Sequence, residues 1–263
     1  MCCGHSVLAL RVGADSLSPG SCWAFASVET LESHWALASG NVIEELSEQQ
    51  ILDCVPNPEE CGGTGGCGGG TPDLAYEALI ASGGGLASEW TYPYISGTGT
   101  GVGPCKFSGA GVATITGWTM LPSNDQEAVM EALAFAGPLA VNVDASAWHA
   151  YEGGVFTGCS HSDVEIDHVV QLVGYGIDAD TKLAYWLVRN SWGSSWGENG
   201  YVRILREPDN EHCFIDNEPW EGVDCLNVTS PIQTATACGE CGILYSVTYP
   251  TVAAPQRKAT VAR

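Results

Sequence analysis

Basic side chains are scarce in this sequence. Its 263 residues include 9 Lys and Arg against 31 Asp and Glu, which gives a formal net charge of −22 at pH 7. Proteins that bind nucleic acid need clustered Lys and Arg to neutralise phosphates, so this composition argues against a nucleic-acid partner. The acidic residues are scattered along the chain, and we expect them to form a solubilising surface.

Long apolar runs are scarce as well. No stretch approaches the roughly 18 apolar residues of a membrane span, so we expect no membrane partner. Near the N-terminus the apolar run Val7 to Leu10 is too short for a signal peptide. Cysteine, by contrast, is abundant, with 12 residues in the chain. This number indicates disulfides and therefore an oxidising compartment. The N-terminus and the cysteine content therefore point to different locations.

The apolar pattern predicts helices first and strands afterwards. Hydrophobic residues make up 45% of the sequence, enough for one large globular domain or two closely packed ones. Segments with helical spacing and helix caps occur at 22–39, 47–54, 71–83 and 123–137. Short β-branched or aromatic runs follow at 139–145, 168–176, 184–192 and 200–207. This order predicts an α+β protein.

Capping residues set the expected helix starts. Ser47 opens a capping box, and Thr71 precedes Pro72 at the first position of the next helix. The last helix is expected to be capped by Ser123 or Asn124. The long connections between elements are expected to be loops, at residues 55–70, 83–117 and 207–242.

Three distant segments carry residue types suited to nucleophilic catalysis. "GSCWAF" places Cys22 at a helix N-terminus, where the helix dipole favours a thiolate. His168 begins a strand 146 residues later (168 − 22), a spacing expected for one class of Cys/His/Asn protease. An imidazolium stabilises the thiolate and protonates the leaving amine, and Asn190 at the end of the next strand is placed to orient the ring. Trp192 is expected to shield the bond between His168 and Asn190 from water.

Several motifs occur in one order along the chain: "GSCWAFASVETLESHWAL", "LSEQQILDC", "GCGGGTPDLAYEAL", "GPLAVNVDA", "IDHVVQLVGYG", "YWLVRNSWGSSWGENGYVRI" and "CGILYSVTYP". With them the chain resembles the papain family of cysteine peptidases and is cathepsin-L-like in character. The resemblance implies a two-part fold, helical on the left and β-barrel-like on the right, with the active-site cleft between the parts. It also implies a monomeric endopeptidase, without cofactor or metal, that acts on peptide or protein substrates in a lysosome, a vacuole or the extracellular space.

The resemblance implies a role for individual residues. Cys22 would be the nucleophile, forming a thioester acyl-enzyme, with His168 as general acid and base and Asn190 as the orienting residue. Substrate backbone would pair with Gly69 and Gly70. A pocket for the second residue before the scissile bond, suited to an apolar side chain, would be lined by Thr71, Pro72, Asn142, Ile166 and Ser246. Asp167 is a further residue expected to bind substrate.

Cysteine pairing is only partly implied by the family pattern, which suggests Cys54–Cys105 and Cys159–Cys241. Residues 207–240 are an insertion relative to compact family members and contain Cys213, Cys225 and Cys238. A local Cys213–Cys225 bridge would hold this insertion, and a Cys61–Cys67 bridge is a further hypothesis. The spacing of Cys238 and Cys241 also fits a zinc or redox dithiol, but the chain offers no second ligand pair, which favours disulfides.

The sequence departs from the family before the nucleophile. The family has a Gln six residues upstream, which donates to the oxyanion, and a Cys three residues upstream; here these positions hold Ser16 and Pro19. We therefore expect four segments: an atypical N-terminal segment (1–19), a helical part (20–115), a β-rich part (116–252) and a tail (253–263). For function, the alternative to a peptidase is a catalytically weakened or inactive peptide-binding homologue, and the presence of both the nucleophile and the base favours the peptidase. For segment 1–19, the abrupt change favours a misassigned gene start or splice site over a genuine natural truncation.

Overall fold

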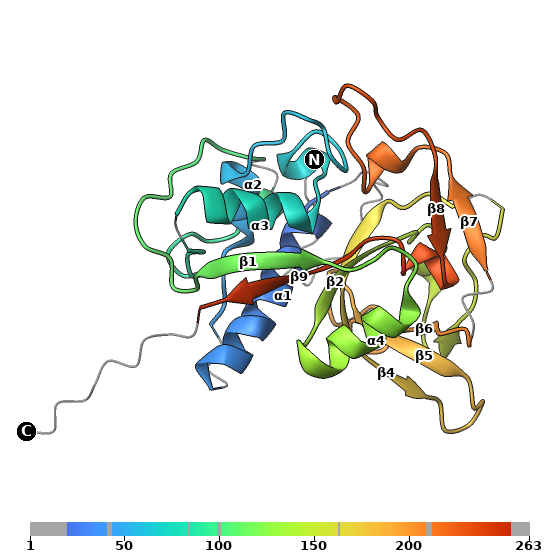
Figure 1. The fold of residues 1–263 in the computed structure, drawn as a ribbon. Helices are drawn as coiled ribbons and strands as arrows, with labels where there is room; N and C mark the ends of the chain where they lie inside the picture. Colours follow the sequence, from blue (N-terminus) through green and yellow to red (C-terminus); the bar gives the residue numbers. More distant parts are fainter. Residues whose placement is uncertain are drawn as a thin grey trace, which may run out of the picture.

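Helix α1 (Cys22–Ser39) lies beside the sheet and carries the first residues of the expected site (Figure 1). The computed structural model describes residues 20–40, 44–83, 85–98, 101–162, 164–208 and 212–253. Ser16 and Pro19 lie outside the described residues. Helix α1 matches its predicted range and ends at Gly40, whose φ of 85° is the left-handed conformation that suits a glycine.

The other helices follow the predicted caps with one exception. Helix α2 (Glu48–Cys54) starts at Ser47, whose hydroxyl accepts a hydrogen bond from the Gln50 amide at 3.0 Å. Helix α3 (Pro72–Ala81) starts directly after Thr71. Helix α4 (Gln126–Phe135) is capped by Asp125, not by Ser123 or Asn124 as predicted. Asn124 is engaged elsewhere, because its side chain donates to the Thr236 carbonyl and accepts from the Cys238 amide.

Seven strands form one sheet in the order β1-β9-β2-β4-β5-β6-β3. Their bounds are β1 (Ile115–Met120), β2 (Leu139–Val143), β3 (Val155–Phe156), β4 (His168–Ile177), β5 (Ala184–Arg189), β6 (Tyr201–Leu205) and β9 (Val247–Val252). All neighbours are antiparallel except β3 and β6. Within the described part of the chain, β1 pairs only with β9 and β3 only with β6. The expected barrel is therefore not closed.

The described residues form two large buried clusters. One joins the helices and includes Trp23, Leu46 and Tyr76, and the other lies against the sheet and includes Trp148 and Trp186. Helix α1 packs on strand β4 between them. Short 3-10 turns occur at η1 (Gly66–Gly68), η2 (Ser96–Thr98), η3 (Trp148–Ala150), η4 (Pro219–Glu221) and η5 (Glu240–Gly242).

The insertion at 207–240 is folded rather than a plain loop, contrary to the prediction. Strands β7 (Cys213–Asp216) and β8 (Ala235–Cys238) form a separate antiparallel pair, visible beside the main sheet in Figure 1. A disulfide joins Cys213 to Cys238, so the predicted Cys213–Cys225 bridge is wrong. Side chains of this pair form a third buried cluster with Val164 and Ile166, which anchors the insertion on the segment before β4.

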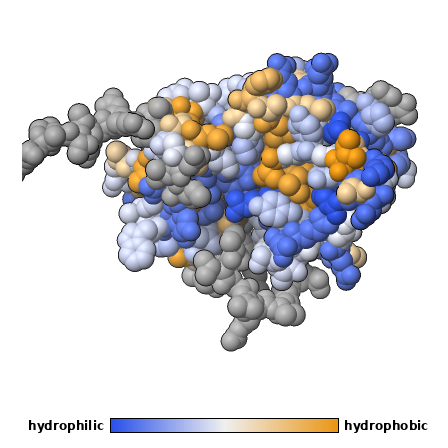
Figure 2. Space-filling model, turned by 90° about the horizontal axis from the view of Figure 1, so that it is seen from below, coloured by the Kyte–Doolittle hydropathy of each residue, from blue (hydrophilic) through white to orange (hydrophobic). Residues whose placement is uncertain are grey.

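Apolar side chains gather in patches on an otherwise largely hydrophilic face (Figure 2). The exposed apolar residues of the described chain include Phe135, which is 86% exposed at the end of α4, and Ile177, which is 66% exposed at the end of β4. Within the described residues no helix has both the length and the apolar character needed to cross a membrane.

Candidate active site

Cys22 is the first residue of helix α1 and is half-buried. The amide groups in the first turn of a helix have no acceptor within that helix, and their dipoles favour a negative charge. The next residue fixes this helix end, because Trp23 is fully buried and its indole N–H donates to the Gly66 carbonyl at 2.9 Å. The Cys22 thiol is therefore held at a rigid, electropositive helix terminus.

His168 and Asn190 meet because β4 and β5 are antiparallel neighbours. His168 is the first residue of β4, and Asn190 follows the last residue of β5. The two side chains are buried and joined by a hydrogen bond of 2.9 Å between His168 Nε2 and Asn190 Oδ1. The same oxygen accepts from the Ser191 amide, which keeps it turned toward the ring. Because Asn190 Oδ1 can only accept a hydrogen bond, His168 Nε2 must carry the proton and donate it. The other ring nitrogen, Nδ1, is then the one that interacts with Cys22.

The thiol and the imidazole shift each other's pKa values in opposite directions. Burial alone raises the pKa of Cys22, but its hydrogen bond to His168 and the charge of that ring outweigh burial and lower the thiol pKa from its ordinary value. Burial alone lowers the pKa of His168, but the interactions with Cys22, Asn190 and Asp167 together raise it. Both directions favour a thiolate–imidazolium pair at neutral and mildly acidic pH.

Aromatic rings enclose the imidazole. Trp192 lies against His168 with ring centroids 5.3 Å apart, and Trp148 meets the same ring edge-on at 6.0 Å. His149 stacks on Trp192 at 5.1 Å and was not singled out from the sequence. Its position next to Trp148 offered no signal, since the stack depends on how η3 folds against the loop after β5. Both His168 and Asn190 are buried beneath this group of side chains, with 6% and 5% of their surface exposed.

The glycines expected to meet substrate backbone lie beside α1. A Cβ added to Gly70 would lie 2.8 Å from the Trp23 ring, so a side chain at this position would displace the helix end. Gly69 has a φ of 100°, and its carbonyl accepts from the Gly65 amide at 2.8 Å. Glycine at both positions is therefore required by close packing and backbone conformation.

The residues expected to line the pocket for the second residue before the scissile bond are buried. Thr71, Asn142 and Ile166 are 2%, 1% and 0% exposed, and Pro72 and Ser246 are also buried. Two of these residues contact the insertion, because the Asn142 side chain donates to the Gly222 carbonyl at 2.9 Å and the Gly222 backbone lies against the Ile166 carbonyl. Asp167 is half-buried, and burial together with the nearby Asp144 charge raises the pKa of its carboxyl despite a hydrogen bond from the Ala145 amide.

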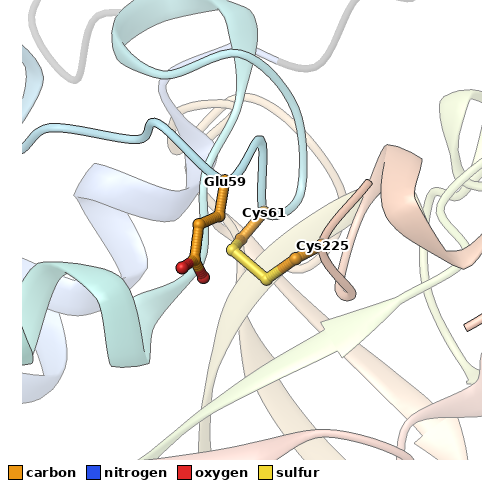
Figure 3. A group of neighbouring side chains, drawn as sticks. All are labelled: Glu59, Cys61 and Cys225. Atoms are coloured by element: carbon orange, nitrogen blue, oxygen red, sulfur yellow. A yellow bond between two sulfur atoms is a disulfide. The ribbon is translucent and has the colours of Figure 1, made fainter. Parts of the chain in front are cut away.

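Two disulfides were implied by the resemblance, and a third disulfide near the helical part was not. Cys54–Cys105 and Cys159–Cys241 are both present, as the resemblance implied. Cys61 bonds to Cys225 across 164 residues, so the hypothesis of a Cys61–Cys67 bridge is wrong (Figure 3). Cys67 is itself disulfide-bonded.

Two groups of possible metal ligands occur among the described residues, and each contains a disulfide. One combines Glu59 with the sulfurs of Cys61 and Cys225, and the other combines Glu240 with those of Cys159 and Cys241. Metal coordination by cysteine requires a free thiolate. Neither group can hold a metal through its cysteines while the disulfides are intact.

Comparisons with known proteins give the site its context. The family model described as "Papain family cysteine protease" matches residues 11–223, so the chain belongs to the papain family. The match starts inside the segment 1–19. Cysteine proteinase A of Leishmania mexicana is 40% identical over 219 residues, and the match covers 83% of this chain and 58% of that protein. Procathepsin L of Mus musculus is 41% identical over 201 residues, covering 74% and 57% respectively.

The fold comparison agrees with the sequence comparison. A structure of bromelain from Ananas comosus in complex with the inhibitor E64 superposes with a TM-score of 0.68 at 34% identity. The match covers 91% of this chain and 94% of the bromelain chain. The papain-like fold is therefore shown, whereas the curated relatives above are longer than the segment that they share with this chain.

Proposed function

We propose that this chain is a cysteine endopeptidase that hydrolyses peptide bonds through Cys22, His168 and Asn190. The observation that carries the proposal is the arrangement of these three side chains: a thiol at a helix N-terminus, an imidazole hydrogen-bonded to it, and an amide oxygen 2.9 Å from the other ring nitrogen. Membership of a family named for cysteine proteases supports the same reaction.

The proposed reaction has two stages. The Cys22 thiolate attacks the scissile carbonyl, and His168 donates its proton to the leaving amine, which departs as the thioester forms. A water molecule then loses a proton to His168 and attacks the thioester, which releases the acid and restores the Cys22 thiolate beside the protonated His168. Asn190 keeps the ring aligned in both stages without competing for its proton.

Oxyanion stabilisation is where this chain differs from the family pattern. The Cys22 amide, at the first position of α1, supplies one donor by the geometry of a helix terminus. Ser16 stands at the position of the family's Gln, and we propose that its hydroxyl or a bound water replaces that second donor only weakly. Loss of one oxyanion donor costs on the order of 10²–10³ in turnover, so the predicted enzyme is slow but active.

A weakened or inactive peptide-binding homologue is the alternative, and Ser16 is the observation that favours it. The nucleophile and the base are both retained and interact with each other, which supports the peptidase. Restoring the amide by Ser16→Gln is expected to raise kcat, with Ser18→Gln as the control for a glutamine placed elsewhere in the same segment. An unchanged kcat in Ser16→Gln would contradict the assignment of residue 16 to the oxyanion.

The substrate is proposed to be a peptide or protein, and the enzyme is proposed to act as a monomer without a cofactor. Disulfides form and persist in oxidising compartments, which supports a lysosomal, vacuolar or extracellular location. Cathepsin L relatives support the lysosomal alternative among these.

The test is hydrolysis of a quenched protein substrate by wild type, Cys22→Ala and His168→Ala. We expect activity only in the wild type. Asn190→Ala is expected to keep part of the activity, because the thiolate and the imidazolium remain while the ring loses its alignment. Equal activity of Cys22→Ala and the wild type would refute the proposal.

A further inference from the structure

Residues 218–227 of the insertion cross from the β-rich part to the helical part, and we call this segment the strap. At the helical side, Cys225 is disulfide-bonded to Cys61 (Figure 3). Two backbone hydrogen bonds flank this disulfide, from the Gly62 amide to the Asp224 carbonyl at 3.0 Å and from the Leu226 amide to the Glu60 carbonyl at 3.3 Å. The strap is therefore fixed covalently to the loop between α2 and α3.

The other side of the strap is anchored on the β-rich part. The Asn142 side chain donates to the Gly222 carbonyl at 2.9 Å, and the Tyr245 hydroxyl lies 3.1 Å from the Asp224 carboxylate. Val223 packs against the cluster that contains Ile166. Substrate is proposed to lie between the helical part, which we call the left-hand wall, and the β-rich part, which we call the right-hand wall. The strap thus contacts both walls.

Gly222 fills the space between these walls. A Cβ added to Gly222 would lie 1.6 Å from the Ile166 carbonyl oxygen, so its backbone already touches the right-hand wall. A Cβ added to Gly62 would lie 2.9 Å both from the Gly222 carbonyl oxygen and from Thr71 Cγ2 on the left-hand wall. Asn142 forms the base and hydrogen-bonds the same carbonyl. A substrate side chain has no room among these groups while the strap is in place.

We infer that the strap determines specificity at the second residue before the scissile bond, with Gly222 taking the place of a substrate side chain. This inference rests on the proposed peptidase function. The enzyme selects substrates with glycine at that position and discriminates against leucine or phenylalanine. The selection depends on the Cys61–Cys225 disulfide, because without it only hydrogen bonds and packing hold the strap.

The test compares two fluorogenic peptides that differ only in having glycine or leucine at that position, assayed without reductant. We expect the wild type to favour glycine in kcat/KM by at least about tenfold, the scale on which a filled apolar pocket discriminates side chains. The double variant Cys61→Ser/Cys225→Ser is expected to gain activity on the leucine peptide and lose this preference. Cys54→Ser/Cys105→Ser, which removes a disulfide that does not touch the strap, is the matched control and is expected to keep it.

A second variant, Gly222→Ala, tests the inference even where the double cysteine variant does not fold. Gly222→Ala places a methyl group against the Ile166 carbonyl and must lift the strap, so it is also expected to raise activity on the leucine peptide. A wild type that cleaves the leucine peptide as well as the glycine peptide would overturn the inference. So would a wild type that cleaves neither peptide while Cys22 reacts rapidly with iodoacetamide, because the strap would then close the whole cleft. An unreactive Cys22 would instead overturn the proposed function.

Discussion

Glu29 lies in the middle of α1 and faces Arg189 at the end of β5. Its side chain is 4% exposed, and its Oε1 lies 3.3 Å from Arg189 Nη2. Burial is the dominant influence and raises the pKa of Glu29 to about 8, although the Arg189 charge opposes the shift. In the unfolded chain the pKa of a glutamate is about 4.3. Between these two values the folded protein holds a proton that the unfolded chain has released.

The consequence is a loss of stability as pH rises. A group whose pKa is raised by folding contributes fully below its unfolded pKa, and the contribution disappears as pH rises toward the folded pKa. Each unit corresponds to about 1.4 kcal/mol, so Glu29 alone lowers the free energy of unfolding by about 4 kcal/mol between about pH 5 and about pH 8. Glu29→Gln cannot titrate and is expected to lack this loss.

The assay is urea denaturation at about pH 5 and about pH 8 in a Cys22→Ala background, which prevents self-digestion. We expect the difference between the two pH values to be smaller in Glu29→Gln than in its parent by about 4 kcal/mol. Glu131→Gln, at an exposed position of α4, is the control and is expected to behave like the parent. Identical pH dependence in Glu29→Gln and its parent would show instead that Glu29 is ionised in the folded protein.

Three further predictions concern the site and the strap. A plot of kcat/KM against pH is expected to be bell-shaped. Asn190→Ala is expected to move the alkaline limb of this plot to lower pH, because the Asn190 hydrogen bond helps to raise the pKa of His168. An alkaline limb that does not move would contradict this prediction. Trp192→Ala is expected to lower kcat several-fold and to leave the preference for glycine over leucine unchanged, as measured with the two fluorogenic peptides. A changed preference would mean that Trp192 acts on the substrate pocket. Glu59→Gln is expected to speed reduction of the Cys61–Cys225 disulfide by dithiothreitol. The substitution removes a carboxylate that lies within 4.8 Å of both sulfurs and repels the attacking thiolate. Equal reduction rates in Glu59→Gln and the wild type would contradict this prediction.

The sequence predicted the parts of this molecule that depend on local patterns. The Ser47 capping box and the apolar spacing of 22–39 are short-range signals, and α2 and α1 form where they indicate. The family motifs identified the fold, and the structure brings Cys22, His168 and Asn190 together as the resemblance implied. Their catalytic roles stay predictions until the variants are measured.

Features that depend on long-range contacts were missed. The Cys61–Cys225 disulfide closes a separation of 164 residues, and no local signal selects this pairing from the alternatives that several cysteines allow. The approach of Gly222 to Ile166 is also a long-range contact, because it joins the insertion to the segment before β4. The α4 cap was misplaced since Asn124 is recruited by β8, far along the chain.

In the proposed mechanism Cys22 is a thiolate held by His168, and the rate of Cys22 alkylation by iodoacetamide as a function of pH measures this ionisation. The modified peptide is quantified by mass spectrometry, so that other cysteines do not contribute. We expect rapid alkylation of the wild type well below pH 8.5, about the pKa of an ordinary thiol, and alkylation of His168→Ala only near that value. Identical pH dependence in the two proteins would contradict this mechanism.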